Sequence, residues 1–213
     1  MLNKYLPAFL KAIMAGIMIS IGACAYLGLE NHTLGAMLFT IGLFTIYSLD
    51  FYLFTGKVGY LVDDPNIKQI IVIWCGNFVG TFISAKAVLL TRMVETTEIL
   101  ENVTHYAEVK LTDGYVSIFI LGILCGIMMY IAAQSFKTAH DTNNSVGGYV
   151  GLFLCVMIFL LLGFEHSIAN IFYFTLADVW SVHALIALIV VSFGNAVGGM
   201  LFKLIALPIN NHH

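Results

Sequence analysis

Six long apolar segments constrain the fold of this 213-residue chain more than any other feature. They cover residues 7–29, 33–63, 69–91, 115–134, 147–177 and 183–207. A helix needs about 20 apolar residues to cross the roughly 30 Å hydrocarbon core of a membrane, so each segment is long enough to span it. Apolar residues make up 60% of the chain and charged residues 10%, which is too little polar surface for a soluble domain. We predict an all-α, multi-pass integral membrane protein with six transmembrane helices, forming a single transmembrane domain over residues 1–213.

Charge and motif content exclude several classes of function. The nine Lys and Arg residues are scattered and the net charge is −3, so no basic stripe exists that could bind nucleic acid. The four cysteines stand singly in apolar segments, without the C-x-x-C pairs of metal or redox sites. We find no metalloprotease, phosphate-binding or Ser-His-Asp motif. The sequence therefore predicts that the protein is not an enzyme and has no metal site and no cofactor. The first apolar run is too long for the hydrophobic region of a signal peptide, so it is predicted to be the first span.

The basic residues near the segment ends predict the orientation of the chain. One side of a six-span topology collects Lys4, Lys11, Lys57, Lys68, Lys137 and Lys203. The other side has Lys86, Arg92 and Lys110 together with most of the acidic residues. Because cytoplasmic loops carry the excess of Lys and Arg, we expect both termini in the cytoplasm and the protein in the plasma (inner) membrane. The acidic stretch from Arg92 to Gly114 is expected to form polar lids of modest order.

Polar residues interrupt the second and fifth segments, which are longer than a bilayer requires. The interruptions run from Ser48 to Gly59 and from Gly163 to Asn170. Backbone that leaves a helix inside hydrocarbon is costly unless protein or a water-filled cavity covers it. We therefore expect these breaks to serve a function.

The third and sixth segments share a second signature, a G-N-x-V-G motif. It comprises Gly76, Asn77 and Gly80 in one segment and Gly194, Asn195 and Gly198 in the other. Small residues at this spacing let helices approach closely, and packing alone would explain the glycines. With the matched breaks, however, the motif indicates two copies of a three-span unit, about residues 7–91 and 115–207, the second inverted. Inverted repeats with paired broken helices are typical of a substrate path near the membrane midplane.

The breaks carry the candidate functional residues. His166 is an ionisable side chain inside a span, and an imidazole exchanges protons near neutral pH. The alternative is a structural histidine bonded to the backbone of the break. Glu165 is interpreted as an orienting group that satisfies backbone donors or neutralises a neighbour. Asn170 stands four residues after His166, where its amide could donate to the same ligand. Thr55 supplies a hydroxyl in the other break, opposite His166 in the repeat.

Lys110 stands at the predicted outer entrance of the fourth segment among acidic residues. It is either a solvated surface charge or a vestibule cation that attracts anions.

Four of these motifs together resemble the formate/nitrite transporter family. They are L-F-T-G at 53–56, G-F-E-H-S-I-A-N at 163–170, and the two G-N motifs. The resemblance implies an aquaporin-like 3+3 inverted repeat, a homopentamer with one pore per protomer, and passage of small monovalent weak-acid anions. It places Thr55, His166 and Asn170 in a central polar site and Lys110 at the outer lysine position. The apolar constrictions of the family fall on Phe39, Leu43, Leu53 and Phe159. The chain is short at both ends, so a gating role of an N-terminal segment is not carried over.

Two transport mechanisms and two other functions remain open from the sequence. A bare anion passing Phe39, Leu43 and Phe159 would lose its hydration, whereas a proton exchanged at His166 would make it a neutral acid. In a plain anion channel, selective for hydrosulfide or other small anions, His166 would stay structural and Thr55 and Asn170 would hold the charged form. A scaffold subunit would leave the polar breaks unexplained, and a water or glycerol channel would carry N-P-A motifs, which this sequence lacks. No residue decides among formate, nitrite, lactate and hydrosulfide.

Overall fold

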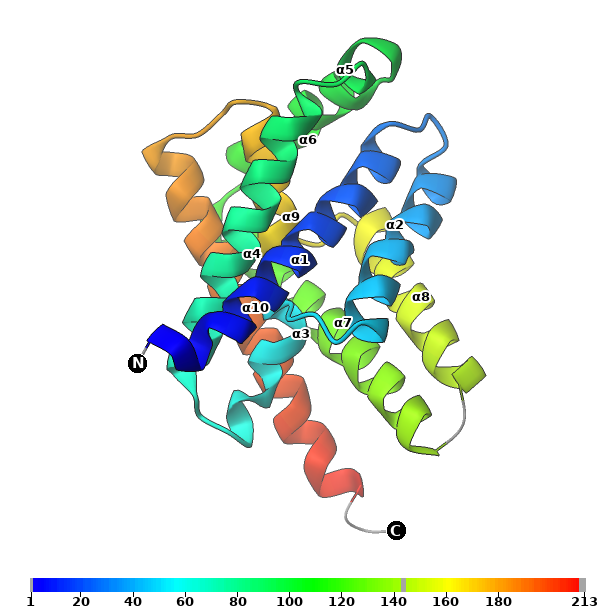
Figure 1. Ribbon diagram of the computed structural model, residues 1–213, viewed down its shortest axis with the longest axis vertical. Coiled ribbons are helices and arrows are strands. Elements are labelled where there is room, and N and C mark those ends of the chain that lie inside the picture. The colour runs from blue at the N-terminus through cyan, green and yellow to red at the C-terminus, as the bar shows by residue number, and fades with distance from the viewer. Residues whose placement is uncertain (1, 143–144, 211–213) are drawn as a thin grey trace.

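The computed structural model describes residues 2–142 and 145–210, and no strand occurs in that part of the chain. The helices are α1 Leu2–Leu27, α2 His32–Ser48, α3 Phe54–Lys57, η1 Val58–Val62, α4 Ile67–Val88, α5 Met93–Thr96, α6 Ile99–Thr112, α7 Tyr115–Thr142, α8 Ser145–Leu161, α9 Ser167–Leu176 and α10 Val182–Asn210. The all-helical prediction is confirmed. Figure 1 shows α5 and the start of α6 at one end of the bundle and the last turns of α10 at the other.

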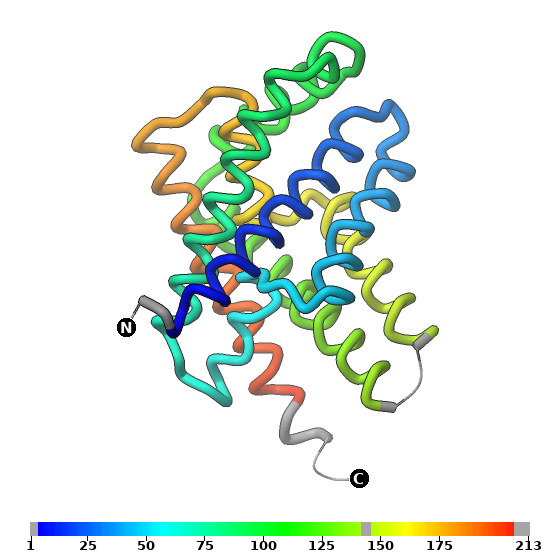
Figure 2. The backbone as a smooth tube through the Cα atoms, viewed as in Figure 1, coloured from blue at the N-terminus to red at the C-terminus, as the bar shows by residue number. Residues whose placement is uncertain are grey.

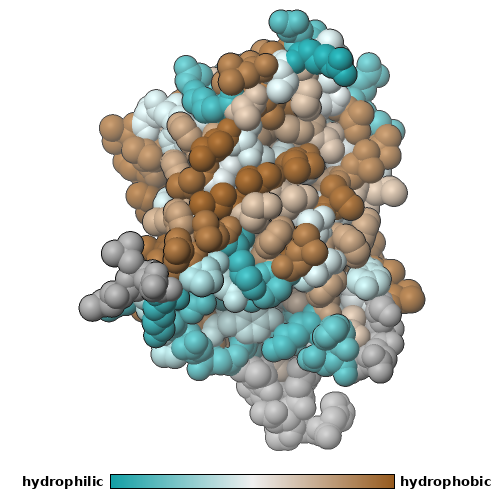
Figure 3. Space-filling model, in the orientation of Figure 1, coloured by the Kyte–Doolittle hydropathy of each residue, from teal (hydrophilic) through white to brown (hydrophobic). Residues whose placement is uncertain are grey.

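Four of the described helices are long and apolar enough to cross a membrane: Lys4–Leu27, Ile67–Val88, Tyr115–Asp141 and Val182–Ala206. Three shorter apolar helices accompany them, at His32–Ser48, Val146–Leu161 and Ser167–Leu176. Figure 3 shows hydrophobic side chains gathered across the middle of the visible face, with hydrophilic ones above and below. An apolar belt of this kind matches the hydrocarbon core of a bilayer, and the protein is an integral membrane protein.

A short non-helical link separates two helices within each of the second and fifth predicted segments. Residues 49–53 connect α2 to α3, and Asp50 there has a φ of 50°. Residues 162–166 connect α8 to α9, and Gly163 has a φ of 69°, a left-handed conformation that glycine adopts without a steric penalty. Figure 2 shows both links between the two ends of the molecule rather than at its surface loops.

The longest helices pack in two matched pairs, α4 against α1 and α10 against α7. A Cβ atom on Gly80 would overlap the carbonyl oxygen of Ile13 in α1. A Cβ atom on Gly198 would likewise overlap the carbonyl oxygen of Ile123 in α7. Glycine at these positions lets the backbones of each pair touch, as membrane helices with small residues do. The other glycine of each motif also lies against its partner helix, Gly76 against α1 and Gly194 against α7, though less closely.

The stretch from Arg92 to Gly114 differs from the polar lid that the sequence predicts, because most of it is helical. Ile99, Val103 and Ala107 are buried on α6, and their four-residue spacing places them on one helix face. α6 packs against α9 and α1. The exposed acidic residues on the opposite side, such as Glu101 and Glu108, dominate the composition and conceal the narrow apolar stripe.

Candidate functional site

Asn77 of α4 fixes the link that precedes α3. Its Nδ2 donates to the carbonyl oxygens of Ala12 and Tyr52, each at 2.8 Å. Its Oδ1 accepts the backbone N–H of Phe54, also at 2.8 Å. One buried amide thus joins α1, the link and the first residue of α3, whose backbone N–H has no partner within its own helix.

Asn195 of α10 makes the equivalent bonds before α9. Its Nδ2 donates to the carbonyl oxygens of Gly122 at 2.8 Å and Glu165 at 2.7 Å. Its Oδ1 accepts the backbone N–H of Ser167 at 2.9 Å. As part of the G-N-x-V-G motif, both asparagines are predicted from the sequence to serve helix packing. In the structure they also hold the links, and the signal for this role is an amide repeated at the same place in two apolar helices.

His166 caps α9 and meets Thr55 of α3 across the centre of the bundle. The Nδ1 atom of His166 accepts the backbone N–H of Ala169 at 3.1 Å, and Nε2 lies 3.0 Å from Thr55 Oγ1. Because Nδ1 is an acceptor, a neutral ring carries its proton on Nε2 and donates it to Thr55. The Thr55 hydroxyl hydrogen is then free for another acceptor. Both side chains are buried.

Lys110, Glu165 and Asn170 form a buried polar chain beside His166. The Nζ atom of Lys110 lies 2.8 Å from Glu165 Oε1, and the two side chains are 10% and 5% exposed. Asn170 Nδ2 donates to Glu165 Oε2 at 2.6 Å. Lys110 therefore lies in a buried ion pair on the last turn of α6, rather than as a solvated charge. This bond uses one of the two N–H groups of the Asn170 amide, and its acceptor Oδ1 has no partner among the described residues.

Aromatic rings enclose this polar group. The rings of Phe39 and Phe159 meet edge to face with centroids 5.8 Å apart, and Phe159 stacks on His166 at 5.6 Å. Leu43 and Leu53 are also fully buried. All four expected constriction residues are thus buried in the core, and Phe159 contacts His166 directly.

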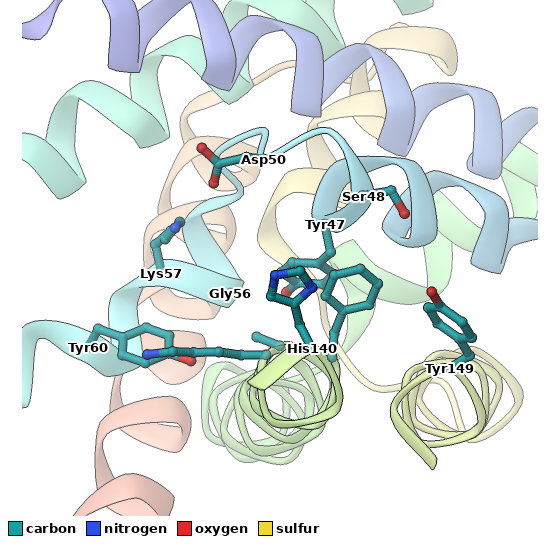
Figure 4. Close-up of a pocket in the computed structure, with 11 residues that line it drawn as sticks. Tyr47, Ser48, Asp50, Gly56, Lys57, Tyr60, His140 and Tyr149 are labelled. Carbon is teal, nitrogen blue, oxygen red and sulfur yellow. The ribbon is translucent and has the colours of Figure 1, made fainter. Parts of the chain in front are cut away.

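Two cavities of different size approach the site. The smaller, about 40 Å³, is lined by Lys110, Phe159, His166 and Asn170 together with Tyr26, Tyr106 and Tyr173. The larger, about 780 Å³, reaches Gly56, the residue after Thr55. Figure 4 shows Asp50 and Lys57 on the chain that follows α2, with His140 and Tyr149 on the other side of this cavity. Neither the tyrosines nor the lining of the larger cavity can be predicted from the sequence, because aromatic residues are common in any membrane helix.

A buried polar site at the ends of two short helices, enclosed by apolar rings and approached by two cavities, is typical of a membrane channel or transporter. The family described as Formate/nitrite transporter matches residues 3–208. This chain belongs to that family, whose members are channels and transporters rather than enzymes, and the resemblance in the sequence is confirmed.

Individual relatives agree with this assignment. The chain is 25% identical to formate channel FocB of Escherichia coli over 77% of its own length and 64% of that protein. It is 27% identical to formate channel FocA of Haemophilus influenzae over 78% of its length and 64% of that protein. The matched region therefore spans just under two thirds of these two relatives. A solved structure described as a pentameric formate channel with formate bound matches with a TM-score of 0.83 at 24% identity, covering 99% of both chains.

Proposed function

We propose that this protein lets small monovalent anions of weak acids, of the formate and nitrite type, cross the plasma (inner) membrane. The proposal rests on the buried hydrogen bond between His166 and Thr55, which connects the two breaks. His166 lines the smaller cavity, and the larger cavity reaches Gly56, the residue after Thr55. Relatives that are named formate channels support the class of substrate.

The architecture belongs to the same proposal. The second span comprises α2, α3 and η1, the fifth comprises α8 and α9, and residues 7–91 and 115–207 form a 3+3 inverted repeat within one domain. The matched bonds of Asn77 and Asn195 support this symmetry. The protein assembles as a homopentamer with both termini in the cytoplasm. The pentameric state of the solved relative supports the assembly.

Proton exchange at His166 is the step that admits the anion past the aromatic rings. A bare anion between Phe39 and Phe159 would lose its hydration, whereas the neutral acid passes at lower cost. The proton donor is the imidazolium, which forms when Nδ1 gains a proton and releases the Ala169 N–H. Its Nε2 proton then passes to Thr55 while the Thr55 hydroxyl proton passes to the anion, which leaves a neutral ring and a neutral acid. Proton exchange is therefore coupled to the N-terminal cap of α9.

The same cap favours a second candidate, the plain anion channel. While Nδ1 accepts the Ala169 N–H, His166 stays neutral and does not titrate. The charged substrate, hydrosulfide included, would then be held by the Thr55 hydroxyl and backbone N–H groups without proton coupling.

The variant His166→Asn separates these mechanisms, because asparagine is a good helix N-cap but does not titrate. Formate flux and internal pH are measured together in proteoliposomes from about pH 5 to 8, the range in which an imidazole titrates. Loss of proton coupling in the assembled variant supports exchange at His166. Unchanged coupling and an unchanged pH profile assign His166 a structural role. His183→Asn, an exposed histidine outside the site, is the matched control.

A further inference from the structure

Two tyrosines close one wall of the small cavity next to His166. Tyr26 of α1 and Tyr106 of α6 meet through their hydroxyl oxygens at 3.1 Å. Tyr26 is 5% exposed and Tyr106 is half-buried. Both residues line the cavity that also contains Lys110 and His166. We refer to Tyr26 and Tyr106 as the tyrosine pair.

Surrounding contacts hold the tyrosine pair in place. Tyr106 stacks on Tyr173 of α9 with ring centroids 6.3 Å apart, and the ring of His32 lies 5.9 Å from that of Tyr26. Asn102 of α6 donates to the carbonyl oxygen of Leu27 at 2.8 Å and so ties α6 to the end of α1. Separation of the two helices is therefore resisted. A solute that crosses this wall must part the two hydroxyl groups by side-chain rotation.

The size of the cavity limits what can lie behind the pair. One water needs about 10–15 Å³ of such space, so about 40 Å³ accommodates roughly three water-sized groups. Formate and nitrite fit this space, whereas acetate and lactate carry additional heavy atoms. We propose that the tyrosine pair is a selectivity filter that admits triatomic anions to the central site and rejects larger monocarboxylates. This inference rests on the proposed function.

The chemistry of the pair also favours anions over apolar solutes. When the hydroxyls separate, each loses a hydrogen bond in a largely buried place, which is costly unless a new acceptor replaces it. A carboxylate or nitrite oxygen accepts a phenol O–H, so a passing anion restores the lost bond. An apolar molecule of the same size leaves the hydroxyls unpaired.

The ratio of acetate to formate uptake into proteoliposomes tests the filter. Tyr106→Ala should raise this ratio by about tenfold, the scale on which one additional methylene is discriminated in a fitted pocket, while formate uptake continues. Tyr115→Ala, which removes a 42% exposed tyrosine next to His183, is the matched control and should leave the ratio unchanged. An unchanged ratio in an assembled Tyr106→Ala protein overturns the inference.

A milder variant keeps the test valid if Tyr106→Ala does not assemble. Tyr106→Phe keeps the ring and removes the bond to Tyr26, so the pair should open more often. Because every solute must part the pair, formate uptake itself should then rise by up to about fivefold, which corresponds to one hydrogen bond of about 1 kcal/mol. Formate uptake no faster in Tyr106→Phe than in the wild type overturns the role of the pair as a barrier. A wild-type protein that carries neither anion contradicts the proposed function instead, which distinguishes the two failures.

Discussion

Asn77 and Asn195 make the same set of hydrogen bonds in the two halves of the chain. Each amide donates to a carbonyl of the adjacent long helix and to a carbonyl in a non-helical link, and accepts the first N–H of a short helix. The two residues therefore hold the polar breaks that bring Thr55 and His166 together.

Replacing either asparagine should destabilise the fold more than replacing an exposed one. Asn77→Ala removes three hydrogen bonds to the backbone, two of them buried, and each buried backbone group left unsatisfied costs about 1–3 kcal/mol. Asn31→Ala, which removes one exposed helix cap, should cost about 1 kcal/mol. Thermal denaturation in detergent compares the two. An Asn77→Ala protein as stable as Asn31→Ala contradicts the role of the amide.

The contact between α10 and α7 should not accept a methyl group at Gly198. In Gly198→Ala the new Cβ would overlap the Ile123 carbonyl, and relieving such overpacking typically costs about 1–3 kcal/mol. Gly114→Ala is the control, because no atom lies within 4 Å of a Cβ at that position. Yield and thermal midpoint should fall for Gly198→Ala only. Equal behaviour of the two variants would contradict the close approach of the helices.

The ion pair of Lys110 and Glu165 predicts a non-additive mutant cycle. Either Lys110→Met or Glu165→Gln leaves one buried charge unpaired, at a cost of about 3–5 kcal/mol, whereas the double variant leaves none. Stability should therefore be lower in each single variant than in the double.

Burial also predicts that the loss of flux in Lys110→Met is independent of salt. A vestibule charge that merely attracts anions would instead lose its effect as ionic strength rises.

The proposed orientation predicts which residues can be labelled from each side. In a background lacking Cys24, Cys75, Cys125 and Cys155, a cysteine at Asp64 should react with a membrane-impermeant thiol reagent only from the cytoplasm. A cysteine at Glu98 should react only from outside. Both positions are exposed, so the access of the reagent depends on the side of the membrane alone. The reverse pattern would invert the topology and leave the repeat unaffected.

The sequence by itself determined the helical fold, the membrane environment and the family. Segment length and hydropathy are local properties, and the G-F-E-H-S-I-A-N and L-F-T-G motifs are contiguous, so no contact between distant residues was needed to recognise them. The matched glycines also indicated close packing, because only small side chains allow helix backbones to touch.

The tertiary structure alone decided which polar atoms are paired and which are free. Residues 55 and 166, or 110 and 165, are far apart in the chain, so no spacing rule predicts that they bond. The fold places the Lys110 ammonium against the Glu165 carboxylate, which also accepts one N–H of Asn170, while Asn170 Oδ1 has no partner among the described residues. The tyrosine pair depends on how α6 packs against α1. A charged or aromatic side chain acquires its role from the groups that surround it, and those groups are assembled only by the fold.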